Sequence, residues 1–173
     1  MFLKATEKDI DAVNRIYDAI HTAEENGTAA IGWIRGVYPV RQTAADAVER
    51  GDLYVAKDGD TVVGAAIINH IQPPSYRGAP WAYPAPDSAV LVLHTLVIDP
   101  AAAGKGLGRA FVDFYEETAK RLSCRALRMD TNARNLRARA LYKKLGYAEI
   151  AVVPCAFNGI PDVQLVLLEK EIE

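Results

Sequence analysis

Alternating glycines follow a strongly apolar segment in the run Gly104-Lys105-Gly106-Leu107-Gly108. Glycines at this spacing let successive backbone N–H groups turn toward one anion, and a helix that begins there adds the positive end of its dipole. Lys105 and Arg109 place positive charge on the same loop and first helical turn. The run therefore predicts a phosphate-binding nest of N–H groups. A simple connection from a strand to a helix is the alternative.

Two better-known phosphate motifs fit this run poorly. A dinucleotide fingerprint needs a third glycine where Arg109 stands, and a P-loop needs a Gly-Lys-Ser/Thr ending that is absent. A nucleotide-binding protein of an unrelated fold remains a competing hypothesis, and it predicts stabilisation by ATP or NAD.

Composition narrows the class of protein. The 173 residues suit one domain, residues 1–173, and half of them are hydrophobic. Because 20 Lys and Arg face 22 Asp and Glu, no overall charge attracts nucleic acid or anionic lipid. No apolar run is long enough for a membrane span, and no leader pattern opens the chain, so we expect a cytoplasmic protein. The spacing of the two cysteines and three histidines predicts neither a disulfide framework nor a metal site.

Hydrophobic periodicity predicts strands alternating with helices. The expected strands are 2–5, 53–57, 61–71, 89–98, 126–130, 148–153 and 163–169, and the expected helices are 7–21, 43–50, 106–122 and 135–145. Thr43 is expected to cap the second helix and Gly51 to end it. This order predicts a mixed α/β layer in which only the strand-helix-strand unit around Gly104 to Arg121 requires a parallel pair.

Three segments are predicted to be irregular. Thr22 to Gln42 reads as a broken helix plus loop, 154–162 reads as a turn region, and Gln72 to Asp87 is a proline-rich loop. Loops as long as the last are uncommon unless they have a function, so we regard it as a candidate substrate wall.

The stretch from Val90 to Tyr147 resembles the GNAT superfamily of N-acetyltransferases. It carries Val97-Ile98-Asp99-Pro100, the glycine run, an amphipathic helix, Asn135, and Leu141-Tyr142-Lys143-Lys144-Leu145-Gly146-Tyr147. The family's first signature falls on Ala103, Gly106 and Gly108, where Ala103 replaces the usual Gln or Arg. The resemblance implies a central, mostly antiparallel sheet of about seven strands with a splayed parallel pair, flanked by about four helices.

The resemblance also implies acetyl-coenzyme A as acyl donor. By position, the backbone groups of Leu96, Val97 and Ile98 would pair with its pantetheine arm, and the Leu96 N–H would lie near the acetyl oxygen. The nest, including Leu107 and Arg109, would hold the pyrophosphate. Core packing is the alternative role for the three strand residues.

The family's second signature assigns Asn135 to coenzyme contact and Tyr142 to protonation of the departing thiolate. Seven residues separate them, nearly two helical turns, so one face presents both. The attacking amine must lose a proton, and His94 is the first candidate base because it interrupts an apolar strand two residues before Leu96. Glu24, Glu25, Asp87 or a water chain are alternatives, and a hydrogen-bonded core histidine is the other reading of His94.

The acceptor side is less defined by sequence. Four aromatic side chains on the two irregular segments could shape an apolar pocket with Glu24, or could pack the loops onto the domain: Trp33, Tyr38, Trp81 and Tyr83. We therefore predict an N-acetyltransferase that transfers acetyl directly to a primary amine of a small molecule or peptide, without metal, and that can form a homodimer. A non-catalytic acyl-coenzyme A sensor of the same fold is the alternative.

Overall fold

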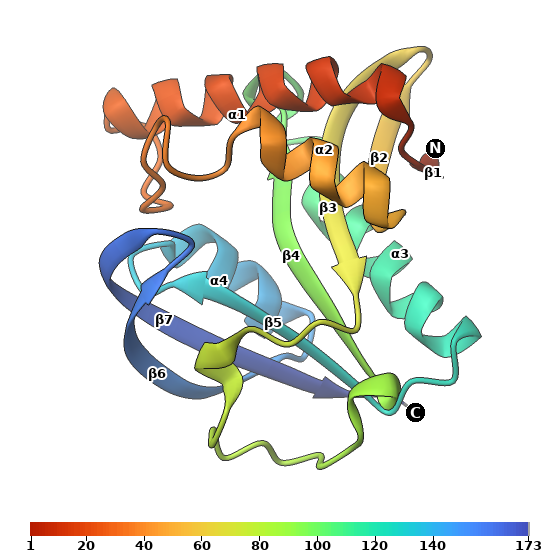
Figure 1. The fold of residues 1–173 in the computed structure, drawn as a ribbon, viewed down its shortest axis with the longest axis vertical. Coiled ribbons are helices and arrows are strands. Elements are labelled where there is room, and N and C mark those ends of the chain that lie inside the picture. The colour runs from red at the N-terminus through yellow and green to blue at the C-terminus, as the bar shows by residue number, and fades with distance from the viewer. Residues whose placement is uncertain (173) are drawn as a thin grey trace.

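The computed structural model describes residues 1–172, in which one seven-stranded sheet is covered by four α-helices (Figure 1). The strands are β1 (Phe2–Lys4), β2 (Leu53–Asp58), β3 (Thr61–Asn69), β4 (Val90–Ile98), β5 (Ala126–Asn132), β6 (Ala148–Phe157) and β7 (Ile160–Glu171). The helices are α1 (Ile10–Glu25), α2 (Arg41–Arg50), α3 (Leu107–Arg121) and α4 (Leu136–Lys144). The predicted order of elements is confirmed. No helix within residues 1–172 has the length and apolarity needed to cross a membrane.

The sheet has the order β1-β2-β3-β4-β5-β7-β6. β4 and β5 run parallel, and each other neighbouring pair in the described chain is antiparallel. The predicted mixed sheet with one parallel pair is therefore confirmed. α3 is the crossover that a parallel pair needs.

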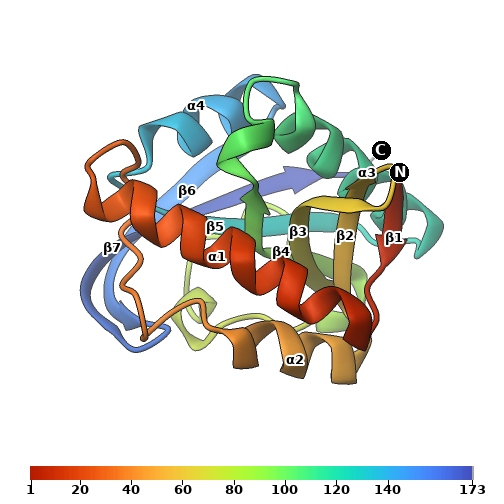
Figure 2. The same cartoon turned by 90° about the horizontal axis from the view of Figure 1, so that it is seen from above.

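Both faces of the central strand β4 are covered. α1 and α2 lie on one side of the sheet, and α3 and α4 lie on the other (Figure 2). Leu91 and Leu93 pack into the core beneath α3, whereas Val97 packs against α1. Val90 and Val92 contact a third apolar cluster under the long loop after β3. This double coverage explains why the strand reads as an almost continuous apolar run.

The ends of the first two helices differ from the predictions. A 3-10 turn over Glu7–Asp9 leads into α1, where Asp9 Oδ2 accepts the Thr6 N–H at 2.9 Å, and α1 continues one turn past the expected end. α2 begins at Arg41, so the expectation that Thr43 caps it is wrong. Thr43 lies inside the first turn, and its hydroxyl accepts the Val40 N–H at 3.1 Å.

The C-terminal hairpin is longer than predicted. β6 and β7 pair from Ala148↔Glu169 to Phe157↔Ile160, so the expected turn over 154–162 shrinks to Asn158-Gly159. Both turn residues have positive φ, as a tight two-residue hairpin requires. Pro154 remains in the strand because β6 is an edge of the sheet, where a missing N–H is tolerated.

A buried ion pair anchors the long loop between β3 and β4. The Arg128 guanidinium donates from Nε to Glu169 at 3.1 Å, from Nη1 to Gln72 at 2.6 Å and from Nη2 to the Tyr83 carbonyl at 3.2 Å. The other Glu169 oxygen accepts the Ala82 N–H at 2.8 Å. The Trp81 ring centroid lies 4.1 Å from the Arg128 guanidinium carbon. The sheet thus holds this loop through the side chains of β5 and β7.

We expect Arg128→Met to lower the free energy of unfolding by about 3–5 kcal/mol, because it leaves the Glu169 carboxylate buried without its cation. Urea unfolding followed by circular dichroism measures the change. The double variant Arg128→Met/Glu169→Leu should recover a large part of the loss. Arg41→Ala is the control, since the Arg41 and Asp11 side chains are 57% and 72% exposed and their pair should add little. A loss for Arg128→Met no larger than the control's would contradict this account.

Candidate active site

The site begins where β4 and β5 separate. The two strands pair only from Val90↔Ala126 to Leu93↔Met129, although both continue beyond these residues. A register shift between β3 and β4 places one extra residue in β4 next to Thr95, which has a φ of +49°. Beyond Leu93, the β4 edge that faces β5 carries no strand partner among residues 1–172. The splayed pair that the family resemblance implied is present.

A cavity of about 1240 Å³ opens at this separation. Its lining includes β4 from His94 to Ile98, the glycine turn, the start of α4, and Asp130 to Asn132 at the end of β5. The remaining walls come from the α1–α2 connection, the segment after β3 and the β6–β7 hairpin. The cavity therefore joins the predicted phosphate nest to the predicted acceptor loops.

The glycine turn lies at one end of the cavity. After the 3-10 turn Pro100–Ala102, Gly104 and Gly106 have φ values of +84° and +76°, and Gly106 is the residue that precedes α3. Successive positive-φ glycines at a helix N-terminus orient N–H groups toward one point. Gly108 and Arg109 also line the cavity, whereas Lys105 is exposed and lies outside its lining.

α4 contributes Asn135 and Tyr142. Asn135 precedes the helix, and its Oδ1 accepts the Ala138 N–H at 3.1 Å, which fixes its side chain beside the cavity. Tyr142 is buried and lines the cavity, with its ring packed 6.1 Å from the Tyr147 ring. Burial, with the nearby Asp130 charge, raises the pKa of Tyr142. The phenol therefore keeps its proton at neutral pH.

Asp130, at the end of β5, is a cavity residue that the sequence reasoning missed. Its Oδ2 accepts the Tyr76 hydroxyl proton at 2.8 Å. Burial raises the pKa of Asp130 to about 7, although the Tyr76 hydrogen bond lowers it. The sequence did carry a signal for this residue: it is acidic and lies at the carboxyl end of a strand in the parallel pair, where α/β sheets bind their ligands.

His94 lines the cavity and is held by a chain of side chains. Asn69 Oδ1 lies 3.0 Å from His94 Nε2 and also accepts the Ile71 N–H at 2.9 Å. The Asn69 amide nitrogen donates to Asp52 at 2.9 Å, so the amide orientation is determined by both neighbours. Nε2 must therefore carry a proton in this contact, which leaves Nδ1 as the acceptor of a neutral imidazole. Burial lowers the pKa of His94 to about 4.

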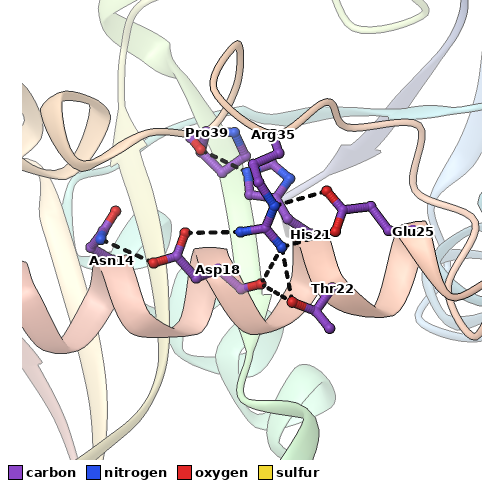
Figure 3. Close-up of polar contacts among 7 residues, drawn as sticks. All are labelled: Asn14, Asp18, His21, Thr22, Glu25, Arg35 and Pro39. Carbon is purple, nitrogen blue, oxygen red and sulfur yellow. Dashed lines mark hydrogen bonds and ion pairs between the residues drawn. The ribbon is translucent and has the colours of Figure 1, made fainter.

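The connection between α1 and α2 is clamped to α1 (Figure 3). The Arg35 guanidinium donates to Glu25 at 2.8 Å and to the Thr22 hydroxyl at 2.8 Å. His21 Nε2 lies 2.9 Å from the Pro39 carbonyl oxygen, and this hydrogen bond is buried. Glu25, an alternative base from the sequence, is thus engaged in holding the loop.

Glu24 also serves this connection. Its carboxylate accepts the Ile31 N–H at 2.6 Å and the Gly32 N–H at 3.1 Å. Glu24 does not line the cavity, and it lies 3.7 Å from Arg134. Asp87, the third alternative base, accepts the Gln72 amide proton at 2.6 Å and is likewise outside the lining.

The structure divides the four predicted aromatic residues. Trp33 and Tyr38 line the cavity with ring centroids 6.0 Å apart, and the Tyr38 hydroxyl hydrogen-bonds the Thr95 hydroxyl. Trp81 and Tyr83 are not brought to the cavity. Trp81 is held against Arg128, and Tyr83 follows it on the anchored loop, so the expectation that both shape the acceptor pocket is not met.

Comparison with known proteins gives the family of the chain and supports its fold. A family model described as Acetyltransferase (GNAT) family matches residues 10–147. A mycothiol acetyltransferase from Beutenbergia cavernae is 37% identical over 76 residues, which make up 44% of this chain and 25% of that protein. The chain thus spans about a quarter of the length of the curated relative it matches.

Solved structures resemble the whole chain. A Salmonella typhimurium protein solved with acetyl-CoA as its cofactor has a TM-score of 0.71 at 18% identity, covering 100% of this chain and 94% of that one. A ribosomal-protein-alanine N-acetyltransferase from Brucella melitensis has a TM-score of 0.72 at 20% identity, covering 99% of each chain. At such identities the likeness shows the fold alone.

We expect Gly106→Ala to lower the free energy of unfolding by about 1–2 kcal/mol, because an L side chain is strained at its positive φ. Gly108→Ala is the matched control: Gly108 has ordinary helical backbone, and a Cβ there would meet Leu141 Cδ2 at 3.5 Å, a normal contact. Urea unfolding compares the two variants. Equal stability would contradict the assigned turn geometry.

Proposed function

Because the chain belongs to the GNAT family of acetyltransferases, we propose that it transfers the acetyl group of acetyl-CoA directly to a primary amine. The observation that carries this proposal is a single cavity that joins the glycine nest, the unpaired edge of β4 and the buried phenol of Tyr142. These are the three features needed to hold a pyrophosphate, an extended arm and a departing thiolate.

The donor fits the nest end and the β4 edge. Gly104, Gly106 and Gly108 would bind the pyrophosphate through backbone N–H groups, with Arg109 adding charge. The backbone of Leu96 to Ile98 would pair with the pantetheine arm as an added strand, and Asn135 would contact the coenzyme. An N–H of β4 aimed at the acetyl oxygen would stabilise the charge that develops during attack.

Asp130 suits the removal of the amine proton better than His94. A general base works best when its pKa lies near the operating pH. The Asp130 pKa of about 7 meets this condition, whereas the His94 pKa of about 4 makes its imidazole a weak base. We therefore assign proton removal to Asp130, while burial keeps His94 neutral beside the acceptor.

The proposed transfer balances in bonds and protons. The ammonium gives one proton to Asp130, and the free amine forms an N–C bond to the acetyl carbon as the C–S bond breaks. Tyr142, which keeps its proton until this step, gives it to the thiolate. The second amine proton leaves as the amide forms, so one proton reaches solvent and one restores the phenol.

We expect Tyr142→Phe to reduce kcat by about 100-fold or more, as for other lost acid catalysts, with little change in the thermal shift given by acetyl-CoA. Coenzyme A thiol release measures turnover, and the melting temperature reports binding. Tyr147→Phe is the control, because it also removes a buried hydroxyl, bonded to Glu116 at 3.1 Å, but outside the cavity lining. Normal turnover in Tyr142→Phe would exclude the acid role. Binding without transfer in the native chain would instead support an acyl-CoA sensor.

The pH profile should separate the two candidate bases. If Asp130 must be ionised, kcat/KM rises as pH increases through about 7, the pKa of its carboxyl group. Asp130→Asn should abolish this rise of kcat/KM with pH. It should also lower kcat/KM by about 100-fold or more. His94→Gln should keep the rise. A profile flat from pH 5 to 8, with loss of activity only near the His94 pKa of about 4, would return the role to His94.

A further inference from the structure

The end of the cavity away from the glycine nest has mostly apolar walls. We call it the acceptor end and define it by the lining side chains of α1, the α1–α2 connection, the segment after β3 and the β6–β7 hairpin, together with Asp130 at the end of β5. Its walls include Ile20, Ile31, Trp33, Ile71, Pro73 and Ile160. Apolar walls with few polar groups bind the body of a ligand through burial of its hydrocarbon surface.

Charge is distributed unevenly along the cavity. Among the described residues that line it, Asp130 is the one acidic side chain. Of the arginines in the lining, Arg109 belongs to α3 and Arg137 to α4, whereas Arg134 precedes α4 and lies 3.7 Å from Glu24, which holds the α1–α2 connection. Arg134 is 68% exposed and faces Glu24. The acceptor end therefore offers Asp130 to a cation, while the arginine closest to its α1–α2 wall, Arg134, is already paired with Glu24.

The polar atoms of the acceptor end are not saturated. Within the described chain, the Asp130 side chain accepts one hydrogen bond, from the Tyr76 hydroxyl. The carboxylate can therefore accept further hydrogen bonds from a ligand. Ser75, the residue before Tyr76, lines the cavity, and its buried hydroxyl has no partner within residues 1–172. A buried polar group without a partner is costly, and an ammonium supplies three donors.

We infer that the acceptor is a primary amine on a compact apolar body, best an aromatic one, with no carboxylate beside the amine. This inference rests on the proposed acetyl transfer and names its substrate class. The ammonium binds Asp130, and the body lies against Trp33 and the aliphatic walls. A T-shaped packing of Trp33 on Tyr38 and the clamp of the α1–α2 connection hold this wall in place.

Other amines meet specific penalties. An α-amino acid places its carboxylate next to the amine and hence near the Asp130 carboxylate, where like charges repel in a site of low polarity. A polyamine buries its second ammonium against apolar walls without a partner. A peptide N-terminus brings a polar amide beside the amine, and the mostly apolar walls offer it few hydrogen bonds.

A matched panel of acceptors tests the inference. Coenzyme A thiol release is measured with acetyl-CoA and phenethylamine, phenylalanine, spermidine or an alanine-led tripeptide. We expect kcat/KM for phenethylamine to exceed each of the others by at least about 10-fold, which corresponds to about 1.4 kcal/mol. Phenylalanine, spermidine or the tripeptide used as well as phenethylamine would overturn the substrate class alone. No release with any amine would overturn the proposed transfer and this inference with it.

A specificity switch tests the wall itself. Ile71 lines the cavity and is 57% exposed, so Ile71→Arg can be accommodated and gives the acceptor end a cation. We expect it to lower the preference for phenethylamine over phenylalanine by at least about 10-fold. Val152→Arg, at a 52% exposed residue outside the lining, should leave that preference unchanged. An unchanged preference in a folded Ile71→Arg variant would overturn the assignment of this wall.

Discussion

The site depends on the early end of the pairing between β4 and β5. Only four residues of each strand pair with the other strand. The bulge at Thr95 then turns β4 away from β5. Because the strands are parallel, both carboxyl ends lie at the same edge, where His94 to Ile98 and Asp130 become walls of one cavity. The same opening brings the glycine turn and Tyr142 beside unpaired backbone. A β4 that paired along its full length would close the site.

An opening in the sheet must be supported from outside, and the chain uses polar anchors for this. Arg128 and Glu169 hold the loop after β3, from which Tyr76 reaches Asp130. Arg35 and Glu24 hold the α1–α2 connection, whose Trp33 forms a wall. Irregular segments are usually the mobile parts of a protein. Here charged hydrogen bonds order them, so the cavity is formed before a ligand arrives.

The sequence predicted the features that depend on interactions between residues close in the chain. The period of apolar residues gave the order of elements, and the glycine run and the Asn135 and Tyr142 spacing predicted residues that share a cavity. The missed features depend on tertiary contacts. In the sequence, Asp130 is an ordinary residue at the end of a strand, and only the fold shows that it is buried and hydrogen-bonded to Tyr76. In the same way, only the fold shows that Trp81 packs on Arg128 instead of lining the pocket. Likewise, α2 begins at Arg41 because a threonine inside the turn, rather than before it, satisfies the Val40 N–H.

Three titratable groups of the cavity, Asp130, Tyr142 and His94, owe their different charge states to one environment. Burial destabilises whichever form of a group is charged, so it raises the pKa of Asp130 and Tyr142 and lowers that of His94. At neutral pH the phenol and the imidazole are therefore uncharged, and Asp130 alone can change its charge. An entering ammonium would restore the ionised carboxylate by pairing with it. In the proposed reaction, the cation that pairs with Asp130 is also the group whose proton Asp130 removes, so the carboxylate is ionised when the acceptor is present.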